Sequence, residues 1–407
     1  MHFNLRKFTA FTESMLLPSI ALIPLLKILT LVCKINIPLQ YLPAAFLVGI
    51  CLFRLRKQWA TILTINLIVF YYCLIAYNLH QFSIDVSILK NQIAAFVYIN
   101  SFMVILLKFN SNSIEKEFKT YAKYLVWTSA LLISLCYVSL FYGLMTKNLS
   151  ISWADLQNLV IFNRADTTSR SMFIWLANPV GFILRDYQNM KMTGPQLLIN
   201  PFLLFLLSNI RADFFKKYQV TAVLIAVLPL FIALNSRALA LSLVVIIFII
   251  TLKNIKHWLH AVYIFSLGLV PILITTLSTS LLNGRKCQIE FVKNNLTVFG
   301  NGIGNKQNEL NTLCGDQLGI QYYQAIKSMT YDNVHIEAIH YFGYAPYLLF
   351  LIYFIYKGIL SNNYQTRLLY TLVFIFFSLN LNLFEIYFVP VLALLATYSF
   401  SSRILRK

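Results

Sequence analysis

Long apolar runs separated by short polar segments dominate the chain. Such runs are long enough to cross a hydrocarbon core of about 30 Å as α-helices. An apolar patch at residues 171–184 is interrupted by Asn178 and Pro179, so we interpret it as interfacial or re-entrant. The pattern predicts an all-α polytopic membrane protein, one domain over residues 1–407, with about 12 transmembrane helices. We expect the spans at residues 15–33, 38–53, 59–77, 92–107, 124–145, 196–210, 218–234, 238–252, 258–282, 338–356, 368–380 and 384–400.

The distribution of lysine and arginine tests this topology, because cytoplasmic loops retain positive charge. With the N-terminus inside, 19 of the 33 Lys and Arg residues fall on the cytoplasmic side. A thirteenth span at 171–184 would move every later cluster outside. We therefore expect a multi-pass protein with both termini in the cytoplasm. The two long loops on the other face, residues 146–195 and 283–337, are the candidates for function.

Composition and charge exclude other classes of protein. Only 12% of the residues are charged and 59% are hydrophobic, whereas a soluble protein carries about 25% charged residues. The formal net charge of +19 therefore does not indicate a nucleic-acid partner. The positive charge of interest is instead that of the 13 cations expected on the outer face, most of them in the two long loops.

Three arginines are the first candidates for a binding site. Arg237 lies between two apolar runs with almost no loop, which holds its guanidinium near the membrane interface. Arg164 and Arg170 lie among hydroxyl-bearing residues in the first long loop. A planar guanidinium suits phosphate or pyrophosphate. The alternative is that these arginines contact lipid headgroups.

The second long loop contains glycines at alternate positions, Gly300, Gly302 and Gly304. The spacing is not that of a dinucleotide-binding fingerprint, so we expect a tight turn with exposed backbone donors. Cys287 and Cys314 flank this turn on the side expected to be oxidising, and we expect a disulfide between them.

The loop ends in a polar helix start that contains His335, Glu337 and His340. The two histidines are five residues apart, about 140° around a helix, so they do not face one ion and no metal is expected. A carboxylate or imidazole at the outer end of a span is suited to act as the general base that accepts the proton of an alcohol. The alternative is a polar helix cap.

Three segments together resemble the O-antigen polymerase and O-antigen ligase superfamily of bacterial inner-membrane glycosyltransferases. Residues 235–240, Asn-Ser-Arg-Ala-Leu-Ala, resemble its Ser-Arg-small-apolar signature. Residues 298–304, Val-Phe-Gly-Asn-Gly-Ile-Gly, are similar to its Gly-x-Gly-x-Gly turn. Residues 334–337, Val-His-Ile-Glu, followed by Gly343, resemble its polar helix start. Members transfer a glycan from undecaprenyl diphosphate to an acceptor hydroxyl on the periplasmic face.

The resemblance implies a metal-independent glycosyltransferase without a cofactor, in the bacterial inner membrane and with both long loops periplasmic. Its partners would be an undecaprenyl diphosphate-linked oligosaccharide, membrane lipid and a chain-length regulator protein. Glu337 or His335 would accept the proton of the attacking hydroxyl. The diphosphate would be held by Arg164, Arg170, Arg237 and Arg285, and Arg237 would also stabilise the leaving charge.

Polymerase and ligase differ in the acceptor, which is a lipid-linked repeat unit for the first and the lipid A core for the second. Ligases usually show His-Asn here, but Ile336 follows His335, while Glu337 lies six residues before Gly343 as in some polymerases. We therefore favour a polymerase, with a ligase as the alternative. A lipid-linked oligosaccharide flippase is the alternative from another class, although its charges would be expected within the spans.

Overall fold

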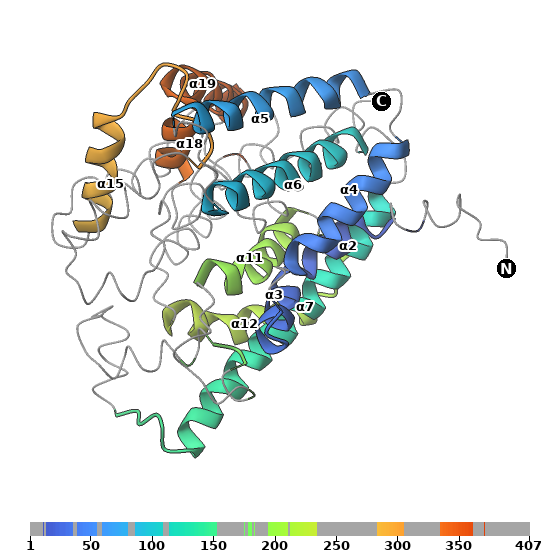
Figure 1. Ribbon diagram of the computed structural model, residues 1–407. Helices are drawn as coiled ribbons and strands as arrows, with labels where there is room; N and C mark the ends of the chain where they lie inside the picture. The colour runs from blue at the N-terminus through green and yellow to red at the C-terminus, as the bar shows by residue number, and fades with distance from the viewer. Residues whose placement is uncertain are drawn as a thin grey trace. The chain divides into compact units, whose positions relative to one another are not determined.

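Helices make up all of the regular secondary structure that the computed structural model describes (Figure 1). The described residues are 11, 14–35, 39–54, 59–79, 86–108, 114–152, 175, 178–180, 183, 194–210, 212–233, 283–304, 334–360 and 370. For these parts of the chain the all-α class is confirmed. That residues 1–407 form a single membrane domain stays a prediction.

The chain divides into two compact units, each of which combines separate stretches of sequence. Unit 1 consists of Met1–Arg54, Val104–Ala240 and Val389–Ala393, and unit 2 of Leu55–Met103, Leu241–Phe388 and Leu394–Lys407. In unit 1, helix α7 packs against α2, α11 and α12. The described elements of unit 1 are α2 (Leu16–Ala21), α3 (Ile23–Val32), η1 (Leu39–Tyr41), α4 (Leu42–Arg54), α7 (Ile114–Met145), α11 (Gly194–Ile210), η3 (Ala212–Phe214) and α12 (Lys217–Ala233).

The first predicted span, residues 15–33, is not one continuous helix. It forms α2 and α3, which are separated at Leu22. Pro24 has no N–H and cannot donate to the carbonyl four residues earlier, which interrupts the helical ladder. The adjacent carbonyl, that of Ala21, accepts a hydrogen bond of 2.8 Å from Nδ2 of Asn200 on α11. A neighbouring helix thus satisfies a backbone carbonyl at the break, as is usual for prolines in apolar bundles.

Replacing Asn200 with leucine is expected to destabilise this helix junction. The amide also donates to Oγ1 of Thr128 at 2.9 Å, so the change removes two hydrogen bonds at a fully buried position. We expect the free energy of unfolding to fall by about 1 to 2 kcal/mol, measured on the purified protein in detergent. Ser134→Ala is the control, since its exposed hydroxyl bonds only within α7. Equal stability of Asn200→Leu and this control would contradict the assignment.

Part of the apolar patch at 171–184 packs on the C-terminal half of α7. Trp175 is buried, and a Cβ on Gly143 would lie 2.8 Å from its indole ring, so the ring occupies the space that this glycine leaves. The hydroxyl of Ser139 donates to the carbonyl of Asn178 at 2.6 Å. Trp175 and Asn178 of the patch therefore lie against α7. Its interfacial or re-entrant character stays a prediction.

Unit 2 contains the helices that follow both long loops. Residues 338–356 were expected to form one helix, but Gly343 separates α18 from α19 and α18 begins earlier, at Val334. The backbone φ of +87° at Gly343 does not continue a right-handed helix, which explains the break. The described elements here are α5 (Trp59–Leu79), most of α6 (Val86–Lys108), α15 (Asn283–Asn294), α18 (Val334–Phe342) and α19 (Tyr344–Leu360).

Two of the described helices are long and apolar enough to cross a membrane, over Trp59–Ala76 in α5 and Lys119–Met145 in α7. Both agree with predicted spans and are consistent with membrane association. The expected spans at 238–252, 258–282 and 384–400 lie outside the described residues. The total of 12 spans and the orientation of the termini stay predictions.

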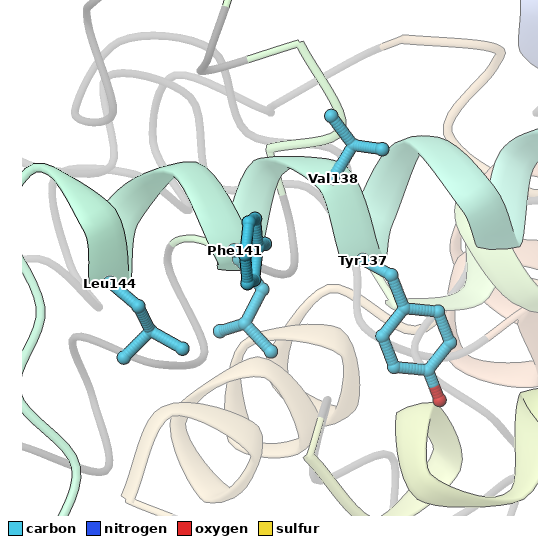
Figure 2. Close-up of a pocket in the computed structure, with 5 residues that line it drawn as sticks. Tyr137, Val138, Phe141 and Leu144 are labelled. Atoms are coloured by element: carbon cyan, nitrogen blue, oxygen red, sulfur yellow. The ribbon is translucent and has the colours of Figure 1, made fainter.

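The C-terminal part of α7 exposes apolar side chains. Tyr137, Val138, Leu140, Phe141 and Leu144 line an open hollow of about 410 Å³ along this helix (Figure 2). The Tyr137 hydroxyl leaves this face and donates to the Ala226 carbonyl of α12 at 2.8 Å. Such a face is typical of contact with lipid or with another apolar surface.

Candidate functional site

The glycine turn, residues 298–304, is confirmed as a turn. Gly300, Gly302 and Gly304 have φ values of +85°, +84° and +82°, in the left-handed region that side chains disfavour. The alternate spacing of glycine in the sequence therefore indicates a backbone with repeated changes of direction. Residues 301–304 are buried, so this part of the turn lies in the interior of unit 2.

The expectation that this turn exposes its backbone donors is wrong for Asn301 and Gly302. The N–H groups of Asn301 and Gly302 donate to the carbonyls of His340 and Tyr341 at 2.9 and 3.1 Å. These carbonyls belong to the last turn of α18, where no intrahelical donor remains. These two donors therefore cap a helix, and they are not available to a ligand.

The same turn also caps α19. The N–H groups of Tyr344 and Ala345, the first two residues of α19, donate to the carbonyls of Thr297 and Val298 at 3.2 and 3.3 Å. One short segment therefore satisfies backbone groups on both sides of the break at Gly343. This arrangement holds the two helices and the turn as one structure, the turn–helix junction (residues 297–303 with α18 and the start of α19).

Gly343→Ala is expected to disrupt the turn–helix junction. A Cβ at this position would collide with the backbone of Val298 and Gly300, and the positive φ adds strain of about 1 to 2 kcal/mol. We expect the midpoint of thermal unfolding to fall by several degrees. Gly49→Ala is the matched control, because a Cβ there meets no atom within 4 Å. Unfolding of Gly343→Ala at the same temperature as the control would contradict this packing.

Helices α5 and α6 hold the other side of the glycine turn. The Ile303 N–H donates to the carbonyl of Tyr72 at 3.2 Å, and the Gln92 side chain donates to the carbonyl of Ile303 at 3.3 Å. The ring of Tyr72 meets that of Phe342 edge to face, with centroids 5.0 Å apart. The candidate site is thus built on helices as well as on the loop.

Asn301 connects the turn to His340. Its Nδ2 atom donates to the carbonyl of Asn295 at 2.8 Å and lies 3.3 Å from Nδ1 of His340. The imidazole of His340 is buried and packs beside Phe291 of α15, with ring centroids 5.7 Å apart. His340 therefore contacts the turn and α15.

His335 contacts a different helix. Its Nδ1 atom lies 3.0 Å from the hydroxyl of Tyr347 on α19, and the two rings meet edge to face. The imidazole is 6% exposed. His335 and His340 thus have different neighbours, which agrees with the angular separation that argued against a shared ion.

Glu337 lies in the first turn of α18 and is 5% exposed. A carboxylate here is favoured by the positive end of the helix dipole. Residues two apart on a helix are separated by about 200°, so Glu337 leaves α18 on nearly the opposite side from His335. Only one of them can face a given ligand directly.

The cationic part of the predicted site lies elsewhere in the chain. Arg164, Arg170, Arg237 and Cys314 are outside the described residues. Arg285 and Cys287 lie in α15, of which only the backbone is described at these positions. The diphosphate site and the disulfide therefore stay predictions.

Sequence reasoning missed two side chains of this site, Asn301 and Tyr347. Asn301 lies between two glycines in the sequence, and an amide side chain at this position was the available signal. Tyr347 lies 12 residues after His335, a separation that carries no signal without the break at Gly343.

Comparison of the chain with protein-family models, with curated proteins and with solved structures finds no match. The resemblance to the O-antigen polymerase and ligase superfamily consequently stays a hypothesis that rests on the residues of the three segments themselves.

Proposed function

We propose that the protein is a multi-pass inner-membrane polymerase that extends a surface polysaccharide at the periplasmic face. It transfers a glycan from undecaprenyl diphosphate to a lipid-linked repeat unit. The observation that supports this most is the turn–helix junction. Residues 298–304, one of the three segments behind the resemblance, hydrogen-bond to the last turn of α18, the helix that begins with a second of these segments, residues 334–337, and they pack against Gly343.

The proposed reaction is a single displacement. The acceptor hydroxyl oxygen forms a bond to the anomeric carbon of the donor, and the bond between that carbon and the diphosphate oxygen breaks. The electron pair of the broken bond leaves with undecaprenyl diphosphate, whose charge arginines stabilise. The proton of the hydroxyl goes to a carboxylate. One displacement inverts the configuration at the sugar.

Glu337 is the base in this proposal. His335 is turned toward Tyr347, within unit 2 and away from the side of α18 that carries Glu337. Arg237, with Arg164, Arg170 and Arg285, supplies the positive charge.

A ligase is the second candidate, and one contact favours it. The hydrogen bond of 3.0 Å between His335 and Tyr347 orients the imidazole, as a histidine base requires. In that case the acceptor is the lipid A core and His335 accepts the proton. Within the part of the chain that the structure describes, no comparable contact favours the flippase.

The surface polysaccharide of a deletion strain separates these functions. Loss of a polymerase leaves the lipid A core with a single repeat unit on a gel. Loss of a ligase leaves a bare core and accumulates lipid-linked polymer. A normal ladder of chain lengths in the deletion strain would contradict both.

A further inference from the structure

Apolar side chains project from the protein around the start of the glycine turn. Leu296, Val298 and Phe299 are 49%, 42% and 65% exposed. The backbone here is fixed, because the carbonyls of Thr297 and Val298 cap the start of α19. The exposure of this apolar tip, residues 296–299, is therefore a property of the fold.

Helix α5 places the apolar tip relative to the membrane. Its apolar window Trp59–Ala76 has 18 residues and is about 27 Å long, close to the thickness of a hydrocarbon core. The glycine turn packs at the C-terminal end of this window: Ile303 N–H bonds to Tyr72, and a Cβ on Gly302 would lie 2.5 Å from the Ala76 nitrogen. The turn and its apolar tip thus lie where α5 leaves the hydrocarbon.

Side chains near that end of α5 have the character of a membrane interface. Tyr71 and Tyr344 are exposed there, and tyrosine concentrates at the level of lipid headgroups. Lys293, on the last turn of α15, is exposed three residues before the tip, and cations are attracted to anionic headgroups. Glu290, the exposed acid of the same helix, lies about one turn further from the tip.

We propose that the apolar tip inserts into the lipid interface and anchors the turn–helix junction at that depth. The occupant is lipid because the tip continues directly into Gly302 and Ile303, which pack on a helix long enough to cross the bilayer. Apolar groups at this boundary gain free energy by leaving water. The anchor would fix α18 at the level where a lipid-linked headgroup lies. It does not depend on the transferase activity.

Photo-crosslinking of the full chain in lipid nanodiscs tests this proposal. Benzoylphenylalanine replaces Phe299 or, in a second protein, Leu296, and the discs contain phosphatidylethanolamine and phosphatidylglycerol. Mass spectrometry after illumination measures protein that has gained the mass of one lipid. Leu349 of α19, 70% exposed, is the positive control position, and Glu290 is the polar control.

We expect lipid adducts at positions 299 and 296 in yields similar to that at 349 and several-fold above that at 290. Yields no higher than at position 290 would overturn the proposal. Crosslinks at 299 to a second copy of the protein would overturn it as well, because they identify a protein surface. Both tip positions are exposed, so if one variant does not fold, the other gives the same answer.

Discussion

Glu337→Gln is expected to stop polysaccharide extension while leaving donor binding intact. The amide has nearly the same shape as the carboxylate but cannot accept the proton of the acceptor hydroxyl. General-base catalysis contributes about 100- to 10,000-fold to a rate, so turnover should fall by at least about 100-fold. Turnover is measured with purified protein and a lipid-linked repeat unit, and donor binding is measured separately with the same substrate.

The control for this change is Glu290→Gln. Glu290 is exposed on α15 in the same unit, so this variant undergoes the same chemical substitution outside the buried start of α18. It should retain normal turnover. Glu337 is buried, so the unfolding temperature of Glu337→Gln must match that of the unchanged protein. Normal turnover in a folded Glu337→Gln protein would remove Glu337 as the base and favour His335.

Arg237→Ala is expected to abolish long-chain polysaccharide without loss of the protein from the membrane. Removing a fixed donor to a developing negative charge costs about 100- to 1,000-fold in rate. The diphosphate leaving group carries such a charge, and water would be a poor replacement for a guanidinium that the sequence places between two apolar runs. The measurement is the length distribution of surface polysaccharide in cells that express the variant at the normal level.

Lys293→Ala serves as the control for charge alone. It removes one exposed cation from the loop face expected to be periplasmic, so the net charge of the protein falls by one, as it does in Arg237→Ala. We expect its polysaccharide to keep its normal length. If Arg237→Ala gives the same modal length as Lys293→Ala, Arg237 contacts lipid headgroups and has no part in transfer.

The helical segments could be predicted where the apolar run had no internal break. The run at 59–77 corresponds to α5, Trp59–Leu79, within two residues at the end. The runs at 15–33 and 338–356 each contain a break that hydropathy does not register. Pro24 was a visible signal for the first break, and Gly343 for the second. A glycine interrupts a helix only where tertiary contacts favour a positive φ, so its effect could not be decided locally.

The glycine turn was predictable, but its role was not. Alternate glycines indicate a backbone in the left-handed region. The carbonyls that accept from the N–H groups of Asn301 and Gly302, however, are about 40 residues away in α18. Contacts of this range depend on how the helices pack, which one sequence does not reveal. For the same reason, the contact of His335 with Tyr347 across the break at Gly343 could not be predicted.

Extension of a lipid-linked glycan by the purified protein tests the central claim most directly. The protein is reconstituted in liposomes with an undecaprenyl diphosphate-linked repeat unit, without added metal, and the products are sized by mass spectrometry. We predict lipid-linked chains of two or more repeats together with free undecaprenyl diphosphate. Unchanged single repeats, in the presence of folded protein and the repeat unit from the same host, would contradict the polymerase assignment.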